Sequence, residues 1–360
     1  MSILFEQTAI GGLLLANRFV RSATYEGLAG ENGTPTSGLI EKLVGLAEGG
    51  VGLIITSHAY VRPEGQAGLH QLGIYKDELI PGFREVTGAV HRSGGKIVLQ
   101  ISHAGIFSTH RATGRTPFVV SRMPGKDFHE ITGEDIGALA GAFAAAAMRA
   151  KAAGFDGVQI HAAHGYLISQ FLSPVFNQRV DVFGGTIENR TQPLLQIYKA
   201  IRKAVGDAFP VLIKLNCNDF ADGGLTTAES LLVARRLAGM GLDAIELSGG
   251  LLTNSTLTPS RAKIRREEDE AYFREEAHDF KDKIGIPLIL VGGIRSFSVA
   301  ESLIEEGIAD YISLSRPLIK EPGLINRWKS GNREKAKCIS CNNCFRTMNS
   351  PHGVYCDIKS

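Results

Sequence analysis

The chain alternates short, nearly unbroken apolar runs with longer stretches in which apolar residues recur at helical spacing. Unbroken apolar runs are typical of parallel strands that are buried on both faces. The pattern predicts strands at residues 19–22, 52–56, 96–101, 157–160, 211–216, 244–247, 288–291 and 311–314. It predicts helices at residues 39–48, 79–92, 135–153, 187–204, 228–238, 265–283, 297–305 and 317–328.

Eight strands, each followed by a helix, in a chain of 360 residues predict an α/β fold of the (β/α)8 TIM-barrel type. A doubly wound sheet is the alternative, but no dinucleotide fingerprint follows the first predicted strand. We expect one barrel domain over residues 1–330, with extra loops at 102–130 and 249–264, and a cysteine-rich tail over 331–360. Catalytic groups of such a barrel lie at the carboxyl ends of its strands.

The composition is that of an ordinary globular protein, with 44% apolar and 21% charged residues. The 39 basic and 37 acidic residues give a formal charge of +2, and we find no basic stripe with interleaved aromatic residues, so nucleic acid is not an expected partner. The longest apolar stretch, residues 137–148, is too short to cross a bilayer. Because Glu6 precedes the apolar run 11–16 and a basic leader is lacking, we expect no secretory signal and a cytoplasmic protein.

The five cysteines are distributed unevenly along the chain. Cys217 stands in an apolar strand-like run and is expected to be a buried thiol. The other four crowd into the last 23 residues, at Cys338, Cys341, Cys344 and Cys356. A disulfide framework would be spread through a secreted fold, so the clustering indicates thiol or metal chemistry in a reducing compartment.

The fourth predicted strand is followed by the motif His161-x-x-His164-x-Tyr166. Residues three apart on a strand face opposite sides, so the two imidazoles converge only if the chain turns after His161. Two neutral imidazoles could donate hydrogen bonds to a substrate oxygen that gains negative charge, and Tyr166 could supply a proton. The alternatives are two core histidines with a packed tyrosine, or a zinc site, for which no third ligand is evident nearby.

The last two predicted strands end in a pattern that favours phosphate binding. Gly292 and Gly293 end the seventh strand, and Ser315 and Arg316 end the eighth. Loops after these strands form the recurrent phosphate site of TIM barrels, where backbone N–H groups and a helix N-terminus meet the anion. Arg316 would add a charge-assisted contact. Tight-turn glycine is the alternative for either element alone.

The segment that begins at His161 continues into a longer signature. The string HxxHGYLI…FLSP…NxRxDxFGGxxENR, over residues 161–190, resembles the signature of the Old Yellow Enzyme family of FMN-dependent oxidoreductases. The resemblance extends from Phe5 and Asn17-Arg18 through Arg316, nearly the whole chain. It implies FMN as cofactor, NADH or NADPH as co-substrate, and reduction of the activated C=C bond of enone or enoate-type substrates.

The resemblance also implies a set of flavin contacts. His58 stands where relatives carry a small residue near the isoalloxazine, and Gln100 matches the glutamine at the pyrimidine edge of FMN. Lys214 replaces the more frequent arginine near flavin N1, and a lysine cannot form the bidentate fork of an arginine. Three residues after the first strand are placed against the flavin ring: Ser22, Ala23 and Thr24.

Two further positions are expected in the substrate site. Tyr25 stands where relatives carry the threonine or cysteine that tunes the flavin potential. His103 begins a His-Ala-Gly sequence that the family shares, although the arginine usual after that glycine is Ile106. Together with His58, Tyr25 implies a site that is more aromatic and polar than usual.

The cysteine tail has several interpretations. Dienoyl-CoA reductase and 2-enoate reductase, larger relatives, hold an iron–sulfur cluster after the barrel with similar cysteines. The cysteines here follow the spacing Cys338-x2-Cys341-x2-Cys344-x11-Cys356, and the third spacing of those relatives is usually one residue longer. Those relatives also add a second domain that binds FAD and NAD(P), which we do not expect here. Zinc or free thiols are preferred over a [4Fe-4S] cluster, and a disordered, partly oxidised end is the remaining alternative.

Three functions remain open. The leading one is an FMN-dependent ene-reductase, in which His161 and His164 hold the carbonyl or nitro oxygen and Tyr166 protonates the α-carbon. The second is a flavin electron-transfer subunit that passes electrons through a tail cluster. The third is a flavin-free barrel lyase or aldolase acting on a sugar phosphate, for which no Schiff-base lysine is evident. Because relatives are commonly dimers or tetramers, we expect a homo-oligomer.

Overall fold

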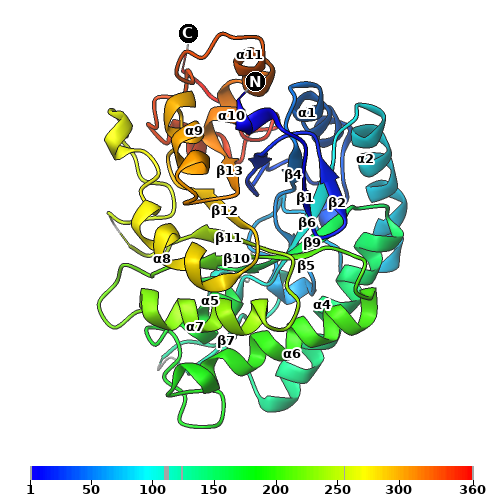
Figure 1. The fold of residues 1–360 in the computed structure, drawn as a ribbon. Helices are drawn as coiled ribbons and strands as arrows, with labels where there is room; N and C mark the ends of the chain where they lie inside the picture. Colours follow the sequence, from blue (N-terminus) through cyan, green and yellow to red (C-terminus); the bar gives the residue numbers. More distant parts are fainter. Residues whose placement is uncertain (1, 109–112, 123–124, 255, 359–360) are drawn as a thin grey trace.

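Parallel strands close into a barrel at the centre of the molecule, and the predicted (β/α)8 fold is confirmed (Figure 1). Its last strand pairs with its first, and its second with its third, so the barrel closes without a gap. Within the described residues, the eight strands of the barrel are β3 (Phe19–Arg21), β4 (Leu53–Ile55), β6 (Ile97–Ser102), β9 (Gly157–Ala162), β10 (Val211–Asn216), β11 (Ala244–Ser248), β12 (Leu288–Val291) and β13 (Tyr311–Leu314). This structure, a computed structural model, describes residues 2–108, 113–122, 125–254 and 256–358.

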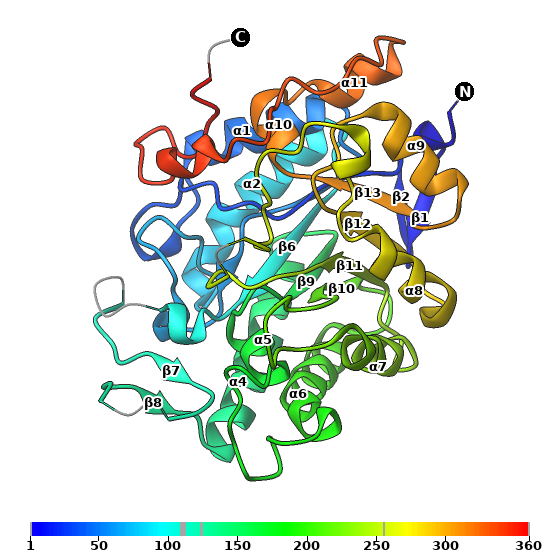
Figure 2. The same ribbon diagram turned by 90° about the vertical axis from the view of Figure 1, so that its left-hand side faces the viewer.

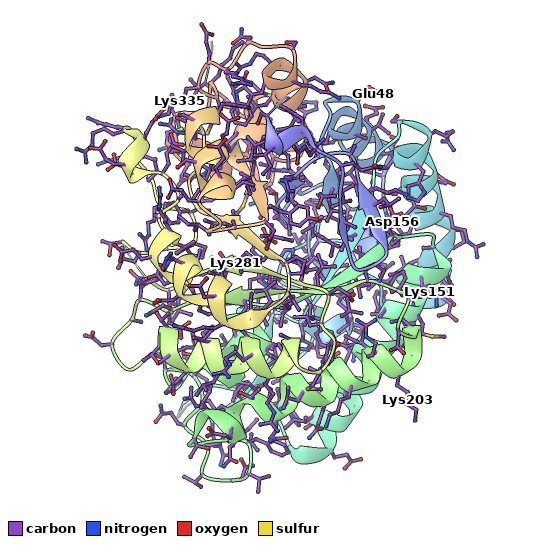
Figure 3. All side chains as sticks on the ribbon, viewed as in Figure 1. Glu48, Lys151, Asp156, Lys203, Lys281 and Lys335 are labelled. Carbon is purple, nitrogen blue, oxygen red and sulfur yellow. The ribbon has the colours of Figure 1, made fainter. Side chains whose placement is uncertain are left out.

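Helices form the outer layer around these strands, as Figures 1 and 2 show from two sides. Charged side chains labelled in Figure 3, such as Lys151 and Lys203, come from this layer. Within the described ranges, no helix is long and apolar enough to span a membrane. The helices are α1 (Ser37–Glu48), α2 (Ile80–Arg92), α4 (Gly133–Ala152), α5 (Leu167–Leu172), α6 (Ile187–Val205), α7 (Thr227–Ala238), α8 (Arg274–Ile284), α9 (Phe297–Glu305), α10 (Arg316–Lys320) and α11 (Leu324–Lys329).

Threonine caps explain where several helices begin. Thr132 accepts a hydrogen bond from the N–H of Asp135, whose carboxylate in turn accepts from the N–H of Thr132. Thr226 and Glu229 form the same reciprocal capping box at α7. A cap satisfies N–H groups that have no partner inside the helix, so α4 and α7 start one or two residues before their predicted ranges.

Two predicted helices are wrong in part. The helix expected over residues 265–283 begins only at Arg274, because Ala271 has φ 49° and Glu270 is buried. The carboxylate of Glu270 accepts from the N–H groups of Arg295 and Ser296, each at 2.8 Å, so the charged run before α8 turns inward at its end, although residues 265–268 are exposed. The helix expected over 317–328 is split into α10 and α11 by Glu321-Pro322-Gly323, where the proline cannot continue a helix.

Short strands outside the barrel occupy both of its ends. The antiparallel hairpin of β1 (Thr8–Ile10) and β2 (Leu13–Leu15) packs Ile10, Leu13 and Leu15 against the interior residues of the barrel. Because the hydroxyl of Tyr311, the first residue of β13, donates to the carbonyl of Ala9 at 2.8 Å, this hairpin covers the amino ends of the strands. Near the other end lie β5 (Ala59–Tyr60), β7 (Phe118–Val119) and β8 (His129–Glu130).

The hairpin should contribute measurably to stability. We expect Ile10→Ala to lower the free energy of unfolding by about 3 kcal/mol, because Ile10 is 0% exposed and its loss leaves a cavity. The control is Leu14→Ala on the same hairpin, where the side chain is 61% exposed and the expected change is below about 0.5 kcal/mol. Urea unfolding of both variants checks this, and equal midpoints would contradict the described packing.

Candidate active site

A chain of buried polar side chains crosses the carboxyl half of the barrel. Gln100 of β6 donates through Nε2 to Gln159 Oε1 of β9 at 2.6 Å. Gln159 then donates through Nε2 to Glu246 Oε2 of β11 at 2.9 Å. Strand register places Lys214 of β10 between His161 of β9 and Glu246. The structure thus brings Gln100, Lys214 and His161, all predicted from the sequence, to the same end of the barrel.

Glu246 is the centre of this network. It is fully buried, and its Oε1 lies 2.9 Å from the Nζ of Lys214. The same oxygen accepts hydrogen bonds from the hydroxyls of Ser22 at 2.7 Å and Ser313 at 2.8 Å. Burial by itself raises the pKa of Glu246, but the Lys214 ammonium and these donors outweigh it, so the pKa lies below its ordinary value. Glu246 is therefore a buried carboxylate that pairs with a buried ammonium.

The sequence analysis missed Glu246 and Gln159, although both carried a signal. Each is a polar residue inside an otherwise apolar predicted strand, and both are 0% exposed. Since buried polar groups need partners, such an interruption indicates either a hydrogen-bond network or a site. The polar residue within each apolar run is the signal that marks these two positions.

The turn that the two histidines require is present. β9 ends at Ala162, and the next residues include His164 with φ 65° and Gly165 with φ 85°, both left-handed. As a result the rings of His161 and His164 lie edge to face with centroids 5.4 Å apart. His164 Nε2 is 2.7 Å from the hydroxyl of Ser248, at the end of β11.

Tyr166 joins the histidines to a third imidazole. Its ring stacks on that of His161 with centroids 4.5 Å apart, and its hydroxyl lies 2.8 Å from His58 Nε2. The ring of Tyr25, which is half-buried, lies edge-on to that of His58 at 5.9 Å. Three predicted catalytic residues and two predicted cofactor or substrate residues therefore form one cluster.

This cluster is held in a neutral state. Burial lowers the pKa of His161 well below its usual range, and the neighbouring His164 and His58 lower it further. Burial and the Lys214 ammonium do the same to the pKa of His164. Burial also lowers the pKa of His58 to about 4 and raises the pKa of Tyr166. His161 Nδ1 is buried and has no hydrogen-bond partner in the described part of the chain, which leaves it available to a ligand.

Beside the network lies a cavity built from the two predicted phosphate loops. Gly293, with φ 74°, lines it, and a Cβ there would lie 2.7 Å from a ring carbon of Tyr272, so only glycine fits. Gly292 precedes it with φ 147°. Ser315 and Arg316 line the same cavity. Since α10 has only five residues, the anion would be held by backbone N–H groups and the guanidinium rather than by a long helix.

The first barrel strand leads into the same region. Thr24 Oγ1 lies 2.8 Å from the hydroxyl of Ser315, which joins the first and last predicted cofactor segments. Ala23 and Thr24 are half-buried, whereas Ser22 is buried against Lys214 at 2.7 Å. These three residues therefore link the cavity lined by Ser315 and Arg316 to the ion pair.

The side chain of His103 contacts residues outside the cluster of His161, His164, Tyr166 and His58. It is 2% exposed, and its ring packs against Gly65, where a Cβ would approach it to 2.5 Å. Its Nδ1 accepts from the N–H of Gly105 at 3.1 Å, and its nearest aromatic partner is Phe118 at 5.9 Å. Burial, reinforced by Arg62, lowers its pKa to about 3. The role of His103 in a substrate site remains a prediction.

The four tail cysteines face a common cavity. Cys338, Cys341, Cys344 and Cys356 line it together with Arg316, and all four are free thiols. Burial raises the pKa of Cys338, and it raises the pKa of Cys344 to about 11. Among the described residues, no group of three or more His, Cys, Asp or Glu side chains is arranged to hold a metal ion. The thiols are gathered together, but they are not arranged as ligands.

Comparison with known proteins places the chain in a family. The family model of the NADH:flavin oxidoreductase / NADH oxidase family matches residues 3–335. The chain therefore belongs to this family of flavin oxidoreductases, and the resemblance to Old Yellow Enzymes is confirmed.

Individual relatives give the same result. An NADH oxidase of Thermoanaerobacter brockii is 38% identical over 348 residues, which cover 94% of this chain and 52% of the relative, so the chain spans about half its length. The structure of a 2-naphthoyl-CoA reductase is similar with a TM-score of 0.90 at 28% identity, over 98% of this chain and 56% of that one. An old yellow enzyme homologue from Zymomonas mobilis gives a TM-score of 0.79 at 26% identity, over 92% and 94%.

Buried neutral histidines make stability depend on pH. Between His58's ordinary pKa of 6.5 and its folded value of about 4, the unfolded chain binds a proton that the folded chain does not. Stability is therefore lost as the pH falls through this window, by about 1.4 kcal/mol per pH unit for one histidine. We expect His58→Gln to flatten the dependence of the unfolding free energy on pH.

Urea unfolding at several pH values in this window checks the expectation. His278→Gln is the matched control, because His278 lies exposed on α8. A His58→Gln slope identical to that of the wild type would show that the folded protein protonates His58.

Proposed function

We propose that the protein is an FMN-dependent oxidoreductase that uses NADH or NADPH to reduce the activated C=C bond of enone or enoate-type substrates. The observation that carries the proposal is the neutral cluster of His161, His164 and Tyr166 beside the buried Lys214–Glu246 pair. Hydrogen-bond donors and a protonated phenol at the carboxyl end of a TIM barrel suit an oxygen that becomes negatively charged and a carbon that needs a proton.

The residues present fit FMN by the chemistry of their donors. The cavity lined by Gly293, Ser315 and Arg316 offers the Arg316 guanidinium and, at Gly293, backbone that no side chain covers. Both suit a phosphate. Lys214 is a cation that would stabilise negative charge on the bound ring, and the amide of Gln100 would serve a polar ring edge. Bound FMN would supply the hydride chemistry that side chains lack.

The side chains of the cluster divide the remaining work. His161 and His164 would orient the substrate through its carbonyl or nitro oxygen and stabilise the charge that develops there. Tyr166, whose raised pKa keeps it protonated, would deliver its proton to the α-carbon. His58, at 2.8 Å from the Tyr166 hydroxyl, would hold that hydroxyl in place.

The remaining proposals concern the setting of this chemistry. We infer a small-molecule substrate, a cytoplasmic location, a homo-oligomer, and no nucleic-acid partner. The balanced charge of +2 supports the last point.

Replacement of the phenol tests the proposed proton donor. We expect Tyr166→Phe to lower the steady-state rate of enone reduction by about 100- to 10,000-fold, because the general acid is lost. Bleaching of the yellow colour by NADH or NADPH under anaerobic conditions should remain at the wild-type rate. Tyr75→Phe, at the half-buried tyrosine that stacks on Tyr60, is the control and should keep both rates. Enone turnover that survives in Tyr166→Phe, or in a His161→Ala/His164→Ala double variant, would contradict the assignment.

A metal in the tail is a second proposal, which rests on the number and spacing of Cys338, Cys341, Cys344 and Cys356 and on the cavity they share, and which requires the thiols to turn from their described arrangement toward a common centre. Zinc or a [4Fe-4S] cluster would suit four thiolates, and a cluster would favour the electron-transfer function over the ene-reductase. We expect anaerobically purified protein to contain zinc or iron with labile sulfide, and Cys341→Ser to lose it. Wild-type protein without stoichiometric metal would contradict the metal site and leave four free thiols.

A further inference from the structure

Arg316 lies between two cavities. It lines the cavity of Gly293 and Ser315 on one side and the cavity of the tail cysteines on the other. Only 8% of this residue is exposed. Its Nη1 donates to the carbonyl of Arg261 at 2.9 Å and to the side-chain oxygen of Asn342 at 2.6 Å. One of the two groups that fix the guanidinium is therefore a side chain of the cysteine tail.

The backbone conformation and the hydrogen bonds of Asn342 suit this contact. It lies between Cys341 and Cys344 with φ 63°, a left-handed conformation in which asparagine is among the best-tolerated residues. While its Oδ1 accepts from Arg316, its Nδ2 donates to the carbonyl of Ser260 at 2.7 Å. A single amide thus bridges the guanidinium and the loop that precedes Arg261.

The segment that carries Asn342 is anchored on both sides. Arg295 Nη1 donates to the carbonyl of Cys338 at 2.6 Å, and the N–H of Lys263 donates to the carbonyl of Ser340 at 2.9 Å. Farther along, the N–H of Val354 donates to the carbonyl of Glu26 at 2.8 Å, after the first barrel strand. Figure 2 shows this red segment beside α1 and α10, so the tail packs against the barrel and does not extend from it.

Lys335, labelled in Figure 3, secures the start of the tail. Its Nζ lies 2.8 Å from Glu270 Oε1, the buried carboxylate that also accepts from the N–H groups at the start of the α9 segment. Because this anchor and those of Arg295 and Lys263 are independent of Asn342, loss of the amide alone should leave the tail in place.

We propose that Asn342 is a positioning residue for the phosphate end of the bound cofactor. Nη1 of Arg316 donates to both Arg261 and Asn342, which uses two of the five N–H groups of the guanidinium. Because the guanidinium is planar, the other three N–H groups then have a fixed direction in which to meet an anion. Without Asn342, Arg316 loses the side-chain acceptor that holds its guanidinium, and the affinity for the phosphate falls. This proposal rests on the proposed function, because it takes FMN as the ligand of the Gly293–Arg316 cavity.

The experiment compares two flavins that differ only in the phosphate. FMN and riboflavin are titrated into flavin-free protein, and the change in flavin fluorescence gives both dissociation constants. Asn342→Gly removes the amide and tolerates φ 63° without strain. We expect it to weaken FMN binding about ten-fold and to change riboflavin binding less than about two-fold. Asn343→Ala, the neighbouring control, should leave both constants unchanged.

Each other outcome has a defined meaning. An unchanged FMN constant in Asn342→Gly overturns the proposal, and so does an equal loss for both flavins, which would indicate general damage to the site. A wild-type protein that binds neither flavin contradicts the proposed function instead. If thermal unfolding shows that Asn342→Gly does not fold, Asn342→Ala replaces it. It also lacks the oxygen that accepts from Arg316, so FMN binding alone should weaken, and wild-type FMN affinity in the folded variant would overturn the proposal.

Discussion

The buried ion pair of Lys214 and Glu246 is the interaction on which the candidate site depends. Two charges removed from water are stable only when their partners are complete, and loss of one partner typically costs about 3–5 kcal/mol. Here Glu246 is satisfied by Ser22, Ser313 and Gln159, which come from three other strands or strand ends. The pair therefore fixes the carboxyl ends of these strands relative to one another as well as placing a cation.

The same pair sets the electrostatics of the neighbouring imidazoles. A buried ammonium close to His164 disfavours a second positive charge, and burial acts in the same direction. A neutral imidazole still has one N–H to donate, and because it carries no charge it needs no counterion in the site. The barrel thus separates two functions: one fixed cation on β10, and neutral hydrogen-bond donors on and after β9.

Sequence patterns predicted the barrel well because buried parallel strands are short and apolar, and each predicted strand ends within two residues of the observed one. They failed where a residue's partner lies far along the chain. Glu270 reads as one charge of an exposed run, yet it is buried by contacts with Arg295 and Ser296. Glu246 reads as part of a strand, and Asn342 as a spacer between cysteines, although its contact with Arg316 depends on how the tail folds back. The spacing of cysteines predicted their common cavity but not the orientation of their thiols.

The packing of the tail beside the first strand has a consequence for biosynthesis. Glu26 and Val354 meet in the folded molecule but are made far apart in time. At about 5–20 residues per second, a ribosome needs roughly 16–66 s to travel from one to the other. During that interval the seven barrel strands after β3 are made, while the side of the barrel that Val354 covers is still exposed. The proposed role of Asn342 would therefore make tight capture of the cofactor a late event, after translation has passed this segment.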